Sequence, residues 1–159
     1  MIPLFAASFF VFNGNAQQPK LESVETEIAK SNQIYFQAFV KGDSSLFIGR
    51  YAKDCCIMPP NTPAICGNEA PLTFFRIAYA MGIRNGKFMT TGVFGNSGKF
   101  VTEEGLFYLY YANGELLDSG KYLVLWKRTP DGWKMFKDSF SSNSEKTGVI
   151  QRSLTVLTL

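Results

Sequence analysis

A run of alternating residues joined by tight turns fills the second half of this chain and constrains its fold more than any other feature. From Lys87 onward, apolar and polar residues alternate with a period of two, which is typical of strands. The pattern predicts strands at 87–95, 99–111, 115–128 and 133–141. Asn113-Gly114 joins the second and third of them, and Asn-Gly between alternating strands is a strong hairpin signal. The sequence therefore predicts an antiparallel meander.

The first half of the chain has the spacing of helices. An amphipathic helix is predicted over 21–40, with its apolar positions at Leu21, Val24, Ile28, Tyr35 and Phe39. Gly42 is placed to end this helix and Asp43 to cap a short second one over 44–48. Asn68 is placed to cap a third helix over 69–81.

A short strand is predicted at 55–58, where two prolines end it, and segment 64–66 is placed to return beside it. Together these elements predict an α+β domain over residues 20–142, with three helices packed on one side of the sheet. Residues 143–159 are interpreted as a C-terminal tail, either an edge strand or a loose extension.

Composition argues against several kinds of function. The net charge is only +3 and the 16 Lys and Arg residues are scattered, so we expect no nucleic-acid partner. Histidine is absent, which removes the commonest general base and the commonest metal ligand. We therefore expect neither a metal site nor a cofactor. The 15% aromatic content fits either an aromatic-lined cavity or a core rich in phenylalanine.

The first twelve residues form an apolar run that is too short to span a bilayer. Small residues at Gly14 and Ala16 follow, at the positions that a signal peptidase reads. We interpret residues 1–16 as a signal peptide, with a buried N-terminal strand or helix as the alternative. The interpretation predicts an exported protein, periplasmic or extracellular, whose mature chain has no membrane span.

Export permits disulfides, and the chain has three cysteines. Cys55 and Cys56 are neighbours on a strand, so their side chains point to opposite faces and only one of them can meet Cys66. A bridge to Cys66 and three buried thiols are both open, and the thiols are expected.

Several short motifs follow one another in a familiar order. They are Tyr35-Phe-Gln-Ala-Phe-Val-Lys-Gly-Asp43, Tyr51-Ala-Lys-Asp54, Met58-Pro-Pro-Asn61, Ile65-Cys-Gly-Asn-Glu69, Gly120-Lys-Tyr122 and Gly132-Trp-Lys-Met135. This succession resembles the SnoaL-like, ketosteroid-isomerase-like branch of the nuclear transport factor 2-like superfamily, over about residues 21–142. The resemblance implies a cone, with three helices packed into a strongly curved sheet that encloses a pocket. It also implies a dimer formed through the outer face of the sheet.

The resemblance implies less about chemistry. The tyrosine that ketosteroid isomerases carry in the first helix matches Tyr35. The family's catalytic aspartate falls at Met58 or Pro59, neither of which can accept a proton. Its second oxyanion-hole acid falls within Leu123-Val-Leu-Trp126. With one of three groups present, isomerisation by that mechanism is not expected, and whether the protein is an enzyme stays open.

Counting from the two turns pairs Leu123 with Glu104 on one side and with Asp138 on the other. One face of the sheet then carries Glu104, Leu106, Lys121, Leu123, Leu125, Phe136, Asp138 and Phe140. We expect this face to line the pocket, where burial would raise the pKa of Asp138 and let it act as an acid or base beside Tyr35. A structural ion pair is the alternative, and one bulge would exchange the faces. The opposite face is expected to form a homodimer interface through Tyr122, Trp126 and Trp133.

The remaining pocket candidates come from the helices and loops. Tyr35, Tyr51, Phe74 and Phe75 are either pocket walls or plain core, and Asn61 either lines the pocket mouth or only forms a turn. Three hypotheses follow. The first is binding of a small apolar or amphipathic molecule; the second is an acid–base isomerase or dehydratase that uses Asp138; the third is a homodimeric association module.

Overall fold

The computed structural model of the protein describes residues 20–96 and 98–144. The elements are α1 (Leu21–Lys41), α2 (Ser44–Ile48), β1 (Tyr51–Met58), β2 (Ile65–Cys66), α3 (Ala70–Ala80), β3 (Asn85–Phe94), β4 (Phe100–Tyr110), β5 (Leu116–Thr129) and β6 (Gly132–Ser142). The segment interpreted as a signal peptide and all but the start of the tail lie outside the described residues.

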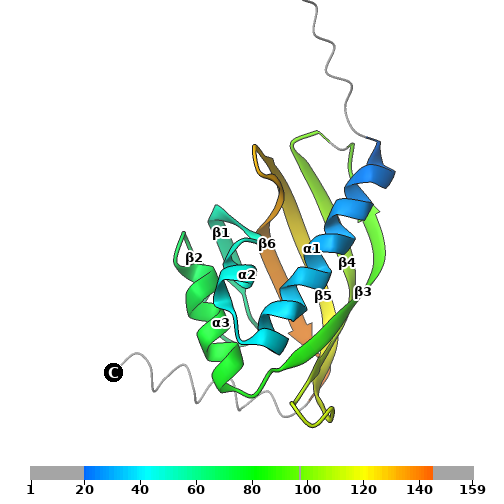
Figure 1. The fold of residues 1–159 in the computed structure, drawn as a ribbon. Helices are drawn as coiled ribbons and strands as arrows, with labels where there is room; N and C mark the ends of the chain where they lie inside the picture. Colours follow the sequence, from blue (N-terminus) through cyan, green and yellow to red (C-terminus); the bar gives the residue numbers. More distant parts are fainter. Residues whose placement is uncertain (1–19, 97, 145–159) are drawn as a thin grey trace, which may run out of the picture.

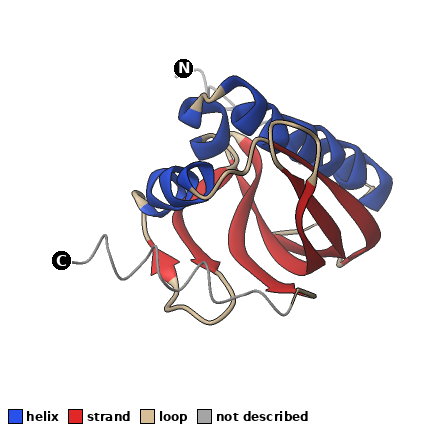
Figure 2. Ribbon diagram, turned by 90° about the horizontal axis from the view of Figure 1, so that it is seen from below, coloured by secondary structure: helices blue, strands red, loops and turns tan. Residues whose placement is uncertain are grey.

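The strands form one sheet in the order β2-β1-β6-β5-β4-β3. The antiparallel meander of β3 to β6 is confirmed, and β1 extends it by pairing in parallel with β6. The sheet curves strongly, and all three helices cover its concave side (Figures 1 and 2). The predicted α+β cone is confirmed, with a larger sheet than the alternating pattern alone indicates.

Helix boundaries follow local chemistry. Gly42 ends α1 with a φ of 66°, a left-handed conformation that glycine adopts without steric cost. The Asp43 carboxylate accepts a 2.9 Å hydrogen bond from the backbone N–H of Ser45, so the predicted cap of α2 is confirmed. The predicted cap of α3 is wrong: the helix starts after Glu69 without a side-chain cap, and Asn68 donates instead to the Glu69 carboxylate.

A cluster of aromatic rings joins the helices to the sheet. The ring of Tyr35 lies 4.6 Å from that of Phe47 and 5.0 Å from that of Phe88, measured between centroids, and Phe39 lies 4.9 Å from Phe75. Such pairs stabilise a core beyond the burial of their area. Much of the aromatic surplus is therefore core packing that holds α1 and α2 against the sheet.

The predicted orientation of the sheet is wrong. Trp126 is fully buried, and Tyr122 and Trp133 are nearly so, which removes these residues as an exposed interface on the described domain. Glu104, Lys121 and Leu123 are exposed on the convex side. The face with two tryptophans is the inner one, because burying this large aromatic surface stabilises the fold, whereas Glu104 and Lys121 on the other face stay in contact with water.

One β-bulge changes the position of Asp138. Between β4 and β5 the predicted pairing of Glu104 with Leu123 is confirmed. Between β5 and β6 the register shifts after Trp126, because Phe136 is an extra residue without a partner. Asp138 therefore pairs with Val124 rather than Leu123 and lies on the inner face.

The cysteines differ from the expectation of three thiols. Strand β2 returns antiparallel to β1 and places Cys66 opposite Cys56, with 4.1 Å between their Cα atoms, and the two form a disulfide. Cys55 points to the other face, where it is a buried free thiol. A return strand of only two residues gave little sign from the sequence that the two cysteines would meet.

Candidate functional site

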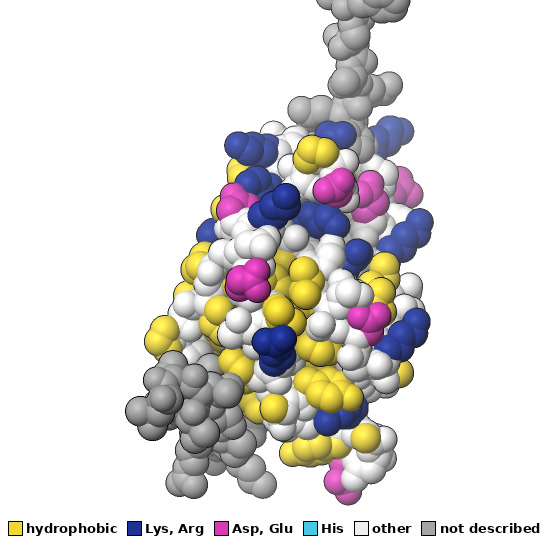
Figure 3. All heavy atoms as spheres, turned by 60° about the vertical axis from the view of Figure 1, so that its left-hand side comes forward, with side chains coloured by type: hydrophobic (Ala, Val, Ile, Leu, Met, Phe, Trp, Pro, Cys, Tyr) yellow, Lys and Arg dark blue, Asp and Glu magenta, His cyan; other side chains and the backbone are white. Residues whose placement is uncertain are grey.

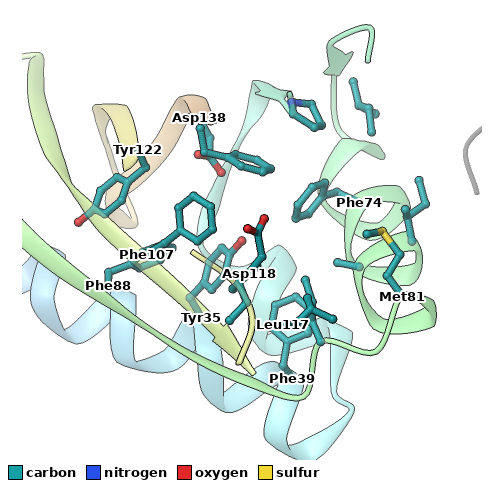
Figure 4. Close-up of a pocket in the computed structure, with 17 residues that line it drawn as sticks. Tyr35, Phe39, Phe74, Met81, Phe88, Phe107, Leu117, Asp118, Tyr122 and Asp138 are labelled. Atoms are coloured by element: carbon teal, nitrogen blue, oxygen red, sulfur yellow. The ribbon is translucent and has the colours of Figure 1, made fainter. Parts of the chain in front are cut away.

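A cavity lies between α1, α3 and the concave side of the sheet (Figure 4). Its volume is about 70 Å³. Since about 10–15 Å³ holds one water molecule on this measure, there is room for a compact molecule or for one end of a longer one. Most of its lining is apolar and much of it aromatic, and includes Phe39, Phe74, Met81, Phe88, Phe107 and Leu117.

Three of the aromatic walls support one another. Phe140 contacts Phe74 on one side and Phe107 on the other, each with ring centroids 5.9 Å apart in an edge-to-face arrangement. Phe74 comes from α3, whereas Phe107 and Phe140 come from β4 and β6. The wall therefore depends on packing between layers, which favours a preformed pocket.

Four polar side chains line the cavity: Tyr35, Asp118, Tyr122 and Asp138. In Figure 4 the Asp118 carboxylate lies between the rings of Phe107 and Phe74, and the Tyr35 hydroxyl points toward the same space. The Tyr122 hydroxyl points away from it. The polar groups available to a bound molecule are therefore mainly two carboxyls and one phenol.

Asp138 is buried, with only 6% of its surface exposed. Its Oδ2 accepts a 2.6 Å hydrogen bond from the Tyr51 hydroxyl. Burial raises its pKa to about 6; the bond from Tyr51 acts against this rise, and the nearby Glu103 adds to it. The carboxyl can therefore exchange a proton near neutral pH.

Tyr35 and Tyr51 are neutral phenols. Burial raises the pKa of each well above its ordinary value, and the charge of Asp138 adds to the effect. Tyr51 is not part of the cavity lining but donates a hydrogen bond to Asp138, whereas Tyr35 lines the cavity itself. Together they supply O–H donors around one carboxyl group.

Asp118 is held differently. The Ser119 backbone N–H and the Ser142 hydroxyl both donate to its Oδ1, at 2.8 and 2.7 Å. Its Oδ2 accepts no hydrogen bond from the described residues. Both serine bonds fix the orientation of the carboxylate and leave one oxygen available.

A second buried acid, Glu103 of β4, connects α1 to the sheet through hydrogen bonds. Its Oε1 accepts hydrogen bonds from Asn32, Thr90 and Tyr122 at 2.7–2.8 Å, and its Oε2 accepts one from the Trp126 indole at 2.9 Å. Sequence reasoning chose its neighbour Glu104. The available signal was position: Glu103 alternates with Val101 and Phe107 on the apolar face.

The structure brings part of the predicted site together. Tyr35, Phe74, Asp138 and Phe140 line the cavity, and Tyr51 contacts it through Asp138. The others lie elsewhere: Phe75 is in the core, Asn61 is exposed in its turn, Phe136 is on the convex face, and Glu104, Lys121 and Leu123 border a hollow on that face. Sequence reasoning missed Asp118. Its position could have indicated it, because Asp118, Gly120 and Tyr122 alternate along one strand and therefore share a face.

Comparison with known structures identifies the fold. The fold matches a nuclear transport factor 2-like superfamily protein from Salmonella enterica, with a TM-score of 0.62, 15% identity, and 79% of this chain and 95% of that chain covered. It also matches a domain of unknown function with a cystatin-like fold from Nostoc punctiforme, at a TM-score of 0.66, 11% identity, and coverage of 86% and 94%. The chain has the nuclear transport factor 2-like fold.

A third structure with the nuclear transport factor 2-like fold, from Novosphingobium aromaticivorans, matches at a TM-score of 0.62 and 15% identity, covering 82% of this chain and 90% of that one. No protein-family model and no curated protein matches the sequence. Likeness at these identities establishes the fold, and one fold hosts many functions. Function must therefore be argued from the site.

Within residues 20–96 and 98–144, no three His, Cys, Asp or Glu side chains gather as metal ligands would. No helix in the described part of the nuclear transport factor 2-like domain is long and apolar enough to cross a membrane. On the face shown in Figure 3, acidic and basic side chains are interspersed, and apolar atoms gather in the lower half.

Proposed function

We propose that this protein binds a small, largely apolar molecule in the cavity between α3 and the sheet. One observation carries the proposal: an aromatic-lined cavity that contains a buried carboxyl, Asp138, with one oxygen fixed by Tyr51. A cavity with apolar walls and a few convergent polar groups is the usual form of a small-molecule site. The walls would give affinity, and Tyr35, Asp118 and Asp138 would fix orientation.

The test uses two variants of the full chain that introduce the same bulk in different places. Met81→Trp places an indole at the cavity wall, whereas Met89→Trp places one on the convex face, where Met89 is 46% exposed. Each is purified natively, and what it carries is identified by mass spectrometry under non-denaturing and denaturing conditions. We expect a small molecule with the wild type and Met89→Trp and its loss from Met81→Trp.

If no small molecule co-purifies, the same two variants still test whether the cavity binds a ligand. Titration with an environment-sensitive apolar dye then replaces mass spectrometry, with thermal unfolding as the check on folding. Equal dye binding by the two folded variants would contradict a ligand site in this cavity.

A second candidate function is acid–base catalysis at Asp138. The observation in its favour is that burial raises the pKa of Asp138 to about 6, within the range useful to a general base at neutral pH. Asp138 would remove a proton from the carbon next to a carbonyl group, and the Tyr35 hydroxyl would donate a hydrogen bond to the resulting enolate oxygen. Deuterium exchange into small cyclic ketones in D₂O tests this. Catalysis predicts exchange that Asp138→Asn abolishes and Glu104→Gln leaves unchanged.

We also propose that the protein is exported. The Cys56–Cys66 disulfide supports this, since disulfides persist mainly in oxidising compartments. Fusion of residues 1–20 to a reporter that is active only outside the cytoplasm tests the leader. A silent fusion with intact expression would contradict export.

A homodimer through the convex face of the sheet is a further proposal. Exposed Met89 and Leu123 support it, at 46% and 50% exposure, in place of the tryptophans expected from the sequence. Sedimentation at several concentrations tests it, with Leu123→Lys as the disrupting variant. A wild type that stays monomeric at every concentration would contradict it.

A further inference from the structure

We propose that the cavity selects a compact organic cation, a protonated amine or quaternary ammonium group on an apolar body. This inference rests on the proposed binding function and specifies its ligand class. It follows from three properties of the lining: the sign of its charged groups, the absence of a counter-charge in the described structure, and the aromatic rings around them.

The charged side chains in the lining are all acidic. Asp118 and Asp138 face the cavity, and no Lys or Arg belongs to its lining in residues 20–96 and 98–144. Each carboxyl costs free energy to remove from water, and a neutral apolar group offsets little of that cost. A pocket for an anion would place carboxyls elsewhere. A positively charged ligand offsets this cost at both carboxyls at once.

Neither carboxyl is neutralised by the protein. The one ion pair among the described residues joins Lys127 to Asp54 on the surface. Asp138 is more than nine-tenths buried, its single hydrogen bond comes from a neutral phenol, and its Oδ1 accepts none from the described residues. Asp118 likewise has Oδ2 left over. The cavity therefore holds two acidic groups with no cationic partner among the described residues.

The walls suit a cation as well. Phe140 contacts Phe74 and Phe107 edge to face, and Tyr35 and Phe88 belong to the same lining. The face of an aromatic ring attracts a cation with about 0.5–2 kcal/mol, more when the site is desolvated. In Figure 4 the Asp118 carboxylate lies between two of these rings, so one bound ammonium group can contact rings and carboxylate together. The cavity volume of about 70 Å³ favours a compact group.

Acidification should weaken the binding of such a ligand. Asp138 is faced by Tyr51 and Cys55 of β1, Tyr35 of α1, Glu103 of β4, and Asp118 and Tyr122 of β5. Among these neighbours no group is cationic. Protonation of Asp138 below about pH 6 therefore removes half of the negative charge available to the ligand.

The test compares two probes of nearly the same shape, benzylammonium and benzyl alcohol. Each is titrated into the ¹⁵N-labelled full chain at neutral pH, and affinities are taken from amide shifts, which also locate the site. Asp118→Asn and Asp138→Asn remove one charge each inside the cavity. Asp131→Asn makes the same change of net charge in the exposed β5–β6 turn.

We expect benzylammonium to bind at least about tenfold more tightly than benzyl alcohol. Asp118→Asn and Asp138→Asn should each lower the affinity for benzylammonium several-fold and leave the affinity for benzyl alcohol unchanged. Asp131→Asn should change neither affinity. If Asp138→Asn does not fold, the Asp118 variant still decides, because Asp118 is only partly buried.

Two results would overturn the inference, and they differ in what else they overturn. Equal affinity for both probes, with shifts confined to the cavity, refutes cation selection and leaves the proposed binding function intact. Binding of neither probe, together with dye binding that Met81→Trp does not alter, refutes both.

Discussion

The Tyr51 hydroxyl donates a 2.6 Å hydrogen bond to Oδ2 of Asp138. The bond connects β1 and β6, which are neighbours in the sheet but are the first and last of the described strands in sequence order. Both residues are buried, and they come from β1 and β6, the only parallel pair among the described strands. The bond exists because the bulge at Phe136 turns Asp138 inward. The same irregularity therefore creates the buried acid and gives it a partner.

Tyr51→Phe removes this bond while keeping the ring. Because the hydrogen bond from Tyr51 favours the charged carboxylate and lowers the pKa of Asp138, its loss should raise that pKa above about 6. The carboxyl ¹³C shift of Asp138, followed by NMR during a pH titration, measures the change. Tyr108→Phe, at a half-exposed phenol in β4, is the control and should leave the value unchanged. A fall in the pKa of Asp138 in Tyr51→Phe would contradict the assigned role.

The pKa of Asp138 also makes stability depend on pH. Its folded value of about 6 is above the ordinary 3.8, so the folded protein holds the proton more tightly than the unfolded chain. The stabilisation is fully present below about pH 4 and is lost as pH rises through about 6. The shift of about two pKa units corresponds to about 3 kcal/mol.

Asp138→Asn should remove this dependence. We expect the free energy of unfolding of the wild type, relative to Asp138→Asn, to fall by up to about 3 kcal/mol between about pH 4 and about pH 7.5. Urea denaturation at the two pH values measures it. A difference that stays constant or grows with pH would show that burial does not hold the proton on Asp138.

Some features of the fold could be predicted because local chemistry determines them. Gly42 and Asp43 set the end of α1 and the start of α2, and Asn113-Gly114 marks the turn between β4 and β5. These signals act over a few residues and need no knowledge of the core. For the same reason the strands of the meander could be placed from alternation alone.

The site could not be predicted in the same way. The bulge at Phe136 has no sequence mark, yet it decides which face Asp138 occupies. The choice between Glu103 and Glu104 depends on which face of β4 is buried, and sequence reasoning chose the face that carries Glu104. Burial of Trp126 decides the question, since its indole N–H needs a buried acceptor and Glu103 is on the same face.

The effects of Glu103→Gln and Glu104→Gln on the free energy of unfolding should differ strongly. Glu103→Gln replaces an acceptor of four hydrogen bonds with an amide that has only one acceptor oxygen and places an NH₂ against other donors. We expect a loss of about 3 kcal/mol in the free energy of unfolding. Glu104→Gln, on the exposed convex face, should change it by less than about 0.5 kcal/mol. Urea denaturation measures both, and equal effects would contradict a structural role for the Glu103 network.

The Cys56–Cys66 disulfide holds β2 against β1, and Ile65 of β2 is part of the cavity wall. Reduction should lower the free energy of unfolding by about 2–3 kcal/mol, because the bridge closes a short loop in the unfolded chain. Urea denaturation with and without dithiothreitol measures this, and the Cys56→Ser/Cys66→Ser double variant should not respond to the reductant. Alkylation of the unfolded, unreduced protein should modify Cys55 alone. Three modified cysteines would show that the bridge does not form and that the wall at Ile65 is held by packing only.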